Sequence, residues 1–272
     1  MVTISHGSTR YVVSELVAEA ATYRLYICSR TDTGEQRLLQ IATGIEHNGG
    51  LDRTAFVLQR FKQASDRFEA ANAKQSPDYQ LNFDRLFPNV VDSFVSDEQN
   101  KRRVNILLLK DVDVITAMAP LSNLRVRDRR RVDIKTSVWI MGRLLKLLNF
   151  SHSQGVAVQL LTDKNVLIGP ERHFVVVLDW TGAFTYQSEV PADARRDDIV
   201  RATQVVFVAL GGDPATGSYP YVCDDTDQQY LEHLRGLMAG RSSDAEQANR
   251  QFYDLVNGLY GVHFHPFRTL PL

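Results

Sequence analysis

The sequence predicts an α+β protein built as two lobes, the first rich in strands and the second mainly helical. Residues 1–110 contain short runs of Tyr, Val, Ile and Leu separated by polar turns, which is typical of an antiparallel sheet. From about residue 111 onward, apolar residues recur at helical spacing, and one pair of apolar strands interrupts the helices. Strands grouped before helices favour an α+β fold, with the second lobe over residues 111–272.

The first lobe is expected to hold a sheet of five strands and one helix. The strand predictions cover residues 11–17, 24–29, 37–42, 90–95 and 103–109. The polar turn TDTGEQ separates the second strand from the third. The helix is predicted over residues 51–73 because apolar side chains recur there at helical spacing. These side chains are Leu51, Ala55, Leu58, Phe61 and Phe68.

The second lobe is expected to hold four helices and one hairpin. The helix predictions cover residues 132–152, 199–210, 230–238 and 245–259. The second of these helices is apolar on nearly all sides, so we expect it to lie in a core. The hairpin lies in GVAVQLLTDKNVLIGPERHFVVVLDWTG, where Asn165 stands at the head of the first strand and Asp179 follows the second strand.

Composition and charge are those of an ordinary globular protein. Of the 272 residues, 44% are hydrophobic and 23% charged, and the net charge of -1 argues against a nucleic-acid binder. Cys28 and Cys223 are too few for a disulfide framework and favour a reducing compartment. The sequence does not open on a signal-peptide pattern, and no apolar run approaches the roughly 20 residues that span a bilayer. We therefore expect a cytoplasmic protein with no membrane or nucleic-acid partner.

Three segments of the first lobe follow a known series of motifs with altered residues. LVAEAATYRLYIC resembles the loop L-G-x-G-x-x-G-x-V-Y, with Ala18, Ala20 and Tyr23 at the glycine positions. RLLQIA is similar to the strand V-A-x-K, with Gln40 in place of the lysine. TAFVLQRF resembles the helix that carries the glutamate partner of this lysine, and Phe56 falls near that place.

Two segments of the second lobe continue the series. VQLLTDKNVLI occupies the slot of H-R-D-x-K-x-x-N, so that Val158, Gln159 and Leu160 replace His, Arg and Asp while Asn165 is kept. LDWTG stands where D-F-G belongs and keeps Asp179.

These motifs stand in the order found in the protein-kinase family, and they cover nearly the whole chain. DDIVRATQVVFVALGGDP is similar to the D-x-Y-x-x-G helix of that family, with Asp198 as the aspartate. Each match is weak alone, but their common order is specific, so the sequence is identified as a degenerate member with a protein-kinase-like fold. The resemblance implies a magnesium site at Asn165 and Asp179. The nucleotide-binding positions that it implies are Ala18, Ala20, Tyr23, Gln40 and Lys110.

The altered residues remove most of what phosphoryl transfer needs. In this family the lysine–glutamate pair holds phosphates, while the catalytic-loop aspartate accepts the proton of the substrate hydroxyl. Leu160 accepts no proton, and Gln40 lacks the charge that strengthens a bond to phosphate. Tyr23 places a bulky ring where the loop bends over the γ-phosphate. The resemblance therefore implies a pseudokinase, an inactive binding or regulatory module that acts through a protein partner.

Two questions stay open at this point. Asp179 and Asn165 are able to chelate magnesium together with ATP, or else Asp179 caps the adjoining turn and Asn165 bonds local backbone. The alternative function is an active ATP-dependent transferase of divergent mechanism, such as a nucleotidyltransferase, which needs no catalytic-loop aspartate. A small-molecule kinase is disfavoured because it does need that residue.

Other polar and apolar segments have structural interpretations. His152 is interpreted as a structural residue at a helix end rather than a base, and the seven histidines show no zinc-site spacing. RVRDRRR, at the start of the helix predicted over 132–152, is interpreted as a solvated face, with an anionic partner as the alternative. The ending GLYGVHFHPFRTLP is expected to pack on the second lobe, with a role as a short docking segment as the alternative.

Overall fold

The computed structural model of the chain describes residues 2–76, 78–112, 115–159 and 161–272. The chain divides into two compact units. The first unit comprises Met1–Ala117 together with Asp179–Ala183, and the second comprises Met118–Leu178 and Phe184–Leu272. In these described ranges, no helix is both long and apolar enough to cross a membrane.

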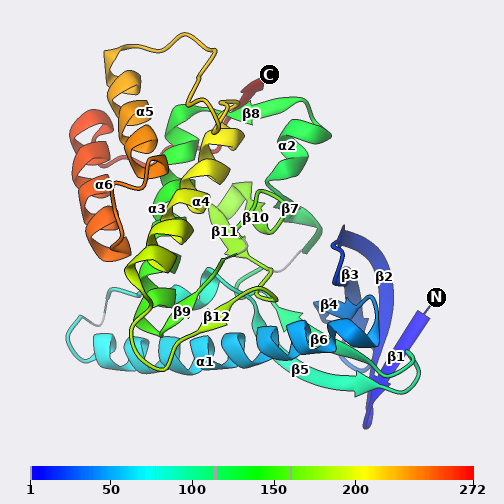
Figure 1. The fold of residues 1–272 in the computed structure, drawn as a ribbon. Helices are drawn as coiled ribbons and strands as arrows, with labels where there is room; N and C mark the ends of the chain where they lie inside the picture. Colours follow the sequence, from blue (N-terminus) through cyan, green and yellow to red (C-terminus); the bar gives the residue numbers. More distant parts are fainter. Residues whose placement is uncertain (1, 77, 113–114, 160) are drawn as a thin grey trace. The chain divides into compact units, whose positions relative to one another are not determined.

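The first unit is built on a six-stranded antiparallel sheet with the order β1-β2-β3-β4-β6-β5 (Figure 1). The strands are β1 Val2–His6, β2 Thr9–Glu19, β3 Tyr23–Arg30, β4 Gln36–Ala42, β5 Asn89–Ser96 and β6 Arg102–Leu108. All five predicted strands are present. The sheet has a sixth strand, β1, which was not predicted. This strand carries one buried side chain, Ile4, so its sequence shows little of the apolar alternation that marks a strand.

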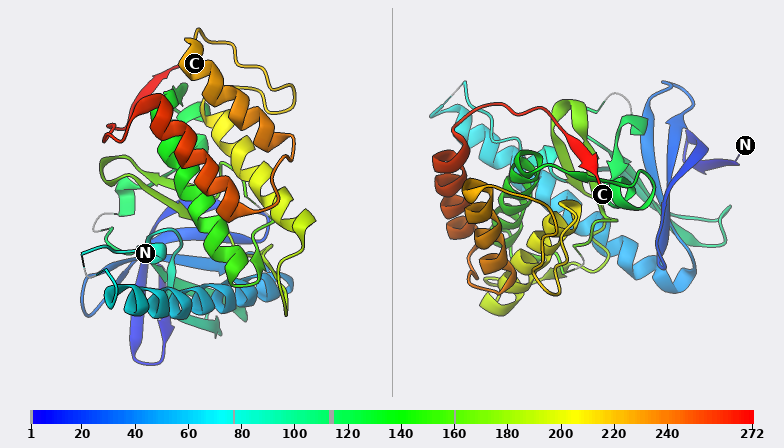
Figure 2. Two further views of the ribbon diagram at one scale, coloured as in Figure 1. Left: turned by 90° about the vertical axis from the view of Figure 1, so that its left-hand side faces the viewer. Right: turned by 90° about the horizontal axis from the view of Figure 1, so that it is seen from above.

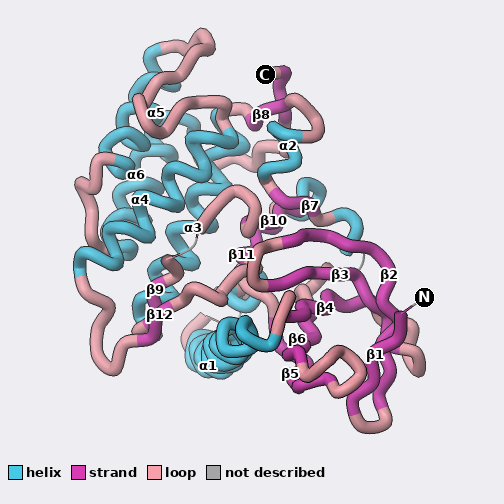
Figure 3. Tube along the Cα trace, turned by 45° about the vertical axis from the view of Figure 1, so that its right-hand side comes forward, coloured by secondary structure: helices cyan, strands magenta, loops and turns pink. Residues whose placement is uncertain are grey.

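Helix α1, Asn48–Ala73, covers one face of this sheet and packs on β4, β5 and β6 (Figure 3). The alternation of side chains along β4 sends Gln40 toward α1 and sends Leu39 and Ile41 into a core on the opposite face. The core on this opposite face also contains Ile4, Tyr11, Cys28, Phe94, Val104 and Ile106. Three short 3-10 helices lie between the longer elements: η1 Ile45–His47, η2 Phe83–Arg85 and η3 Ile115–Ala117.

The second unit is mainly helical, as predicted (Figure 2). Its helices are α2 Ser122–Val126, α3 Ile134–Ser153, α4 Ala192–Ala209, α5 Asp225–Met238 and α6 Ala245–Tyr260. Helix α3 packs against α4 and α6, and α5 packs against α4 and α6. Helix α4 begins well before the predicted residue 199, because Pro191 is placed at its N-cap and the charged turn that follows is helical.

Short strands complete the second unit. The predicted hairpin is present as β10 and β11, and β7 adds a third strand beside β10. Two further pairs are β9 with β12 and β8 with β13. The bounds are β7 Ala119–Pro120, β8 Arg130–Val132, β9 Val156–Ala157, β10 Val166–Gly169, β11 Phe174–Val177, β12 Phe184–Thr185 and β13 Thr269–Pro271, with the 3-10 helix η4 at Pro170–Arg172.

The basic run RVRDRRR lies just before α3 rather than within it, and residues 125–129 are exposed, in agreement with its interpretation as a solvated face. Its first residues end α2 and its last residues form β8. Helix α3 begins only after Asp133, whose carboxylate accepts a hydrogen bond from the N–H of Thr136 at 2.7 Å. The guanidinium of Arg131 lies 3.7 Å from the centre of the Tyr221 ring, so this end of the run is part of the folded unit.

Part of the C-terminal segment packs on the second unit, while the side chains of Val262 and Phe264 stay 80% and 78% exposed. Strand β13 pairs with β8, and the guanidinium of Arg130 donates to the hydroxyl of Thr269 at 2.6 Å. His265 Nε2 lies 2.9 Å from Asp133 Oδ2. The ring of Phe264 stacks on His173 at 4.6 Å.

A substitution in helix α4 can test whether this helix lies in the core of the second unit. Phe207 is 0% exposed, and its ring packs over Gly212 so closely that a Cβ there would meet the ring at 2.4 Å. We expect Phe207→Ala to lower the free energy of unfolding by about 3–5 kcal/mol, measured by urea denaturation. Arg201→Ala, on the exposed side of the same helix, is the control and should change it by about 0.5 kcal/mol or less. A loss below about 1 kcal/mol for Phe207→Ala would contradict the buried position.

Candidate functional site

The segment at the position of the glycine-rich loop is a tight hairpin between β2 and β3. Ala18 pairs with Leu25 across the hairpin, and the N–H of Ala20 donates to the carbonyl of Tyr23 at 2.9 Å. The two strands are joined by only two residues beyond this bond. None of these positions is a glycine. The hairpin therefore lacks the residues that normally let the backbone approach phosphate groups closely.

The tip of this hairpin is bonded to the end of β4. The N–H of Thr43 donates to the carbonyl of Thr22 at 3.1 Å, and the Thr43 hydroxyl donates to the carbonyl of Ala21 at 2.8 Å. Both carbonyls of the turn are therefore engaged within the first unit. A hairpin held in this way is not free to open and close over a ligand.

Tyr23 and Asp179 are far apart in the sequence but meet in the first unit. Tyr23 is 4% exposed, and its side chain lies within reach of the electrostatic influence of the Asp179 carboxylate. Burial raises the pKa of Tyr23, and the charge of Asp179 raises it further, so the hydroxyl stays protonated. The altered last glycine position of the loop is thus connected to the altered D-F-G segment.

Asp179 also caps the turn that follows it. Its Oδ1 accepts from the N–H of Thr181 at 2.9 Å and from the Thr181 hydroxyl at 2.6 Å. The turn is anchored on both sides: Trp180 is 0% exposed and packs edge-on to Phe61 at 5.0 Å, and Arg53 donates to the carbonyl of Thr181 at 2.8 Å. Two donors of Thr181 converge on Oδ1 of this carboxylate, which therefore has a structural role in this turn.

Gln40, at the position of the lysine, is 1% exposed and forms an amide–amide contact. The Nδ2 of Asn105 donates to Gln40 Oε1 at 3.2 Å and to the carbonyl of Leu51 in the first turn of α1 at 3.0 Å. The Oδ1 of Asn105 accepts from the hydroxyl of Ser93 at 2.7 Å. A neutral network therefore joins β4, β5, β6 and α1 where a lysine–glutamate ion pair would stand.

Charged contacts extend this network at the surface. Arg103 of β6 forms an ion pair with Asp52 of α1 and donates to the Ser93 hydroxyl at 2.8 Å. The side-chain oxygen of Asn48, at the start of α1, accepts from the N–H of Arg103 at 2.7 Å. The beginning of α1 is thus held to β6 by bonds of Arg103 to Asp52 and Asn48, and neither Gln40 nor Phe56 takes part in these bonds.

Phe56 does not occupy the place of the glutamate partner, so that interpretation was wrong. Its side chain is 57% exposed, whereas Gln40 is 1% exposed. Since helical side chains share a face at spacings of three and four, the inner face of α1 is formed by Leu51, Ala55 and Leu58. The sequence alignment therefore assigned the glutamate position to the exposed side of α1 instead of the side that contacts the sheet.

Lys110 pairs with a buried acid. Its Nζ lies 2.6 Å from Oδ2 of Asp84, whose side chain is 5% exposed. Asp84 stands in η2, so the ion pair connects this short helix to the residues that follow β6. The ammonium of Lys110 is therefore already matched by a carboxylate in the folded chain.

In the second unit, the segment that aligns with the catalytic loop is held by Asp198. This carboxylate is 0% exposed and accepts from the N–H groups of Val158 and Gln159, both at 2.8 Å. His152 Nε2 lies 3.0 Å from the same carboxylate. These bonds give His152 the structural role predicted for it.

Asn165 bonds its own loop. Its Oδ1 accepts from the N–H of Thr162 at 2.9 Å, and its backbone carbonyl accepts from the N–H of Leu178 at 2.9 Å. Leu160, at the position of the catalytic base, lies outside the described residues. Within the part of the chain that is described, no three His, Cys, Asp or Glu side chains gather as a metal site, so a magnesium ion would depend on few protein oxygens plus nucleotide and water.

The polar residues that organise the first unit were not predicted from the sequence. Asn105, Asp84 and Thr181 each hold one of the expected site residues in place. The sequence does mark Asn105, because it is a single polar residue inside the otherwise apolar run from Val104 to Leu109. Asn is depleted in strands, so such a residue at a buried position needs bonded partners.

No protein-family model matches the chain, and no curated protein matches it either. Solved structures do match. A structure of vaccinia related kinase 3 has a TM-score of 0.64 and 16% identity, covering 95% of this chain and 90% of its own. The BubR1 kinase domain has a TM-score of 0.62 and 11% identity over 94% of this chain and 83% of its own. The double mutant of the PknI kinase domain of Mycobacterium tuberculosis has a TM-score of 0.57 and 14% identity over 92% and 96%.

These neighbours are protein kinase domains, and their identities are low enough that they establish the fold alone. The chain has the protein-kinase-like fold. The prediction made from the order of the motifs is confirmed.

The network around Asn105 can be tested by stability. We expect Asn105→Leu to lower the free energy of unfolding by about 1–3 kcal/mol, because it leaves Gln40 Oε1 and the Leu51 carbonyl buried without this donor. The matched control is Gln59→Leu, an amide on the exposed face of α1. Hydrogen exchange should show the loss in the first turns of α1. Equal stability of the two variants would contradict a role for Asn105 in holding this helix.

Proposed function

We propose that the chain is a pseudokinase, a kinase-shaped binding or regulatory module that does not transfer phosphate and acts through contact with a protein partner. The observation that carries the proposal is the state of Asp179, the remaining acid of the D-F-G position. Its Oδ1 accepts from both the N–H and the hydroxyl of Thr181, and the carboxylate acts electrostatically on the buried Tyr23 side chain. A carboxylate with one oxygen committed to two internal donors is a weakened magnesium ligand.

The reason is the geometry that magnesium demands. It takes near-octahedral coordination at about 2.0–2.1 Å and gives up its waters reluctantly. To bind it through Oδ1, Asp179 would have to give up its bonds to Thr181 and leave these donors unpaired, so that only Oδ2 could serve the metal without this cost. The cost of leaving buried donors unpaired opposes the gain from the metal.

The lysine position supports the same conclusion. Gln40 is neutral and already accepts from Asn105, and Lys110 is already paired with Asp84. A phosphate group would therefore find no uncommitted cation at either of these positions. Loss of one electrostatic contribution of this kind typically lowers a rate by about 10²–10³-fold.

A cytoplasmic location and a protein partner belong to the same proposal. Cys28 and Cys223 are both free thiols, which suits a reducing compartment. Because a module without transfer chemistry can act only by contact, a partner follows from the loss of the catalytic parts. An active ATP-dependent transferase of divergent mechanism is the alternative that the experiments below separate from this proposal.

The nucleotide question is tested by thermal unfolding and by label transfer. We expect no rise in Tm with ATP and Mg²⁺ at millimolar concentration, whereas a ligand at a hundred times its Kd adds about 2.7 kcal/mol. We also expect no transfer from γ-labelled or α-labelled ATP, and no rescue by Leu160→Asp, because Gln40 and Tyr23 would remain.

Each positive result has a defined meaning. A rise in Tm without transfer would keep the pseudokinase but refute the argument from Asp179. Transfer of γ-label that is lost in Asp179→Asn would overturn the proposal in favour of a kinase, and transfer of α-label lost in that variant would establish a nucleotidyltransferase. Label that persists in Asp179→Asn would come from a contaminant.

The structural role of Asp179 has its own test in the absence of nucleotide. We expect Asp179→Ala to destabilise the protein by at least about 1.5–3 kcal/mol, since it removes bonds made to a charged acceptor. Asp66→Ala, an exposed carboxylate paired with Lys62 on α1, is the control and should cost less than about 1 kcal/mol. If Asp179→Ala were neutral or stabilising, the acid would be an unoccupied ligand rather than a structural residue.

A further inference from the structure

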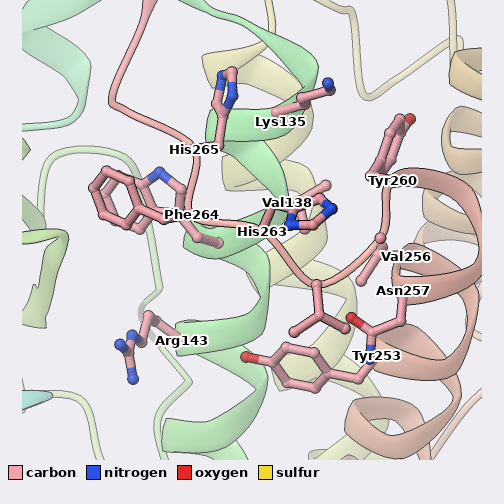
Figure 4. Close-up of a pocket in the computed structure, with 13 residues that line it drawn as sticks. Lys135, Val138, Arg143, Tyr253, Val256, Asn257, Tyr260, His263, Phe264 and His265 are labelled. Atoms are coloured by element: carbon pink, nitrogen blue, oxygen red, sulfur yellow. The ribbon is translucent and has the colours of Figure 1, made fainter.

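A cavity of about 470 Å³ lies in the second unit, between α3, α6 and the segment that follows α6 (Figure 4). This volume is within the range of about 300–1,000 Å³ that holds small organic ligands. Lys135 and Arg143 of α3 are among the lining residues, and Figure 4 shows their side chains on different sides of this helix, with Tyr253 and Tyr260 on α6 and His263 between the two helices. All of these groups belong to one unit and none aligns with the kinase motifs.

The side chains around the cavity are cationic and aromatic. Lys135, Arg143, His263 and His265 supply the polar part, while Trp139, Tyr253, Tyr260 and Phe264 supply flat rings. No Asp or Glu is among the residues that line it. A charged ligand in this cavity would therefore be an anion.

The two permanent cations are not neutralised by the protein. Among the described residues, neither Lys135 nor Arg143 forms an ion pair with a carboxylate, although Arg143 is half-buried. Lys135 lies 5.9 Å from the centre of the Tyr260 ring. A half-buried guanidinium with five donors and no acceptor is strongly disposed to take a carboxylate in two parallel hydrogen bonds.

Two cationic groups, Arg143 and His265, act electrostatically on His173 beside the cavity, and Asp133 pairs with His265. His173 stacks between Trp139, at 4.7 Å, and Phe264, at 4.6 Å. Burial lowers the pKa of His173, and the charges of Arg143 and His265 lower it further. The same charges that resist a proton on His173 attract an anion into the neighbouring space.

The volume of about 470 Å³ is large enough for an aromatic ring. Lys135 and Arg143 are eight residues apart on α3, which separates their Cα atoms by about 12 Å along the helix, so a small carboxylate would contact one of them. The Tyr253 hydroxyl lies against α3 at Gly142, where a Cβ would meet it at 2.5 Å, so this glycine makes room for the tyrosine at the wall. A fatty acyl chain fits these walls poorly, since it would bury polar groups without partners.

We propose that this cavity binds a small aromatic carboxylate, with its ring between the aromatic side chains of α3, α6 and the C-terminal segment and its carboxylate on Arg143 or Lys135. Because this site shares no residue with the nucleotide positions, the inference stands independently of the proposed function. Since His263, Phe264 and His265 form one wall, a bound ligand would also hold the C-terminal segment in place.

The test uses indole-3-acetate as the probe, with its neutral amide, indole-3-acetamide, and inorganic phosphate as comparisons at one fixed pH. Titration of the full chain by NMR should give saturable binding of indole-3-acetate, with shifts in the amides of α3 and of residues 261–265. We expect at least tenfold weaker binding of the amide and of phosphate. Equal binding of the amide would refute the anionic site, and equal binding of phosphate would refute the aromatic one.

Variants identify the cations. Arg143→Gln and Lys135→Gln should each weaken binding, by tenfold or more for the residue that contacts the carboxylate, and Arg143→Lys should restore part of any loss seen in Arg143→Gln. The matched control is Arg250→Gln, which removes the same charge from an exposed site on α6 outside the cavity. Unchanged binding in both cavity variants, shifts confined to other residues, or no saturation at 10 mM probe in the unaltered chain would each overturn the proposal.

Discussion

The side-chain amide of Asn105 joins the sheet and the helix of the first unit, and it does so without a charge. One nitrogen donates to both Gln40 and the Leu51 carbonyl, and the oxygen accepts from Ser93. In protein kinases the helix is held by an ion pair that also binds phosphate, so structural and catalytic demands fall on the same residues. Here the helix is held from β6, and the position of the lysine carries the neutral Gln40, which accepts from Asn105. A buried neutral network of this kind stabilises only when its members are satisfied, which explains why Gln40 and Asn105 are matched to each other.

The aspartates retained at motif positions are used in a similar way. Asp198 is fully buried and holds the backbone of Val158 and Gln159, and this role needs no histidine or arginine side chain at those positions. Asp179 holds its own turn and acts electrostatically on the buried Tyr23 side chain. Backbone donors are present whatever the side chain, so the scaffold of the fold survives where side-chain chemistry has been replaced. This separation accounts for a kinase-like fold with 11–16% identity to its structural neighbours.

The C-terminal segment adds a feature to the second unit that the kinase motifs do not describe. Strand β13 completes a two-stranded sheet with β8, and Phe264 and Phe267 bring rings to Trp139 and His173. Two residues of the basic run take part in this packing, since Arg130 bonds Thr269 and Arg131 stacks on Tyr221. Residues 125–129 of the run stay exposed, as do Val262 and Phe264 of the ending. Both segments are therefore only partly engaged within the unit.

The sequence by itself determined the positions of nearly all the long helices and strands and, through the order of its motifs, the fold. These properties depend on local periodicity and on spacing along the chain, which can be read without partners. It also located Tyr23 and Gln40 as altered positions and Asp179 as a retained one. The tertiary structure alone decided what these residues do, because a partner such as Asn105 or Asp179 comes from another strand or a distant turn. It likewise decided that β1 joins the sheet, because a strand with one buried side chain shows little apolar alternation in its sequence. It also decided that Phe56 faces solvent, because the sequence does not say which side of a helix meets the sheet at a single position.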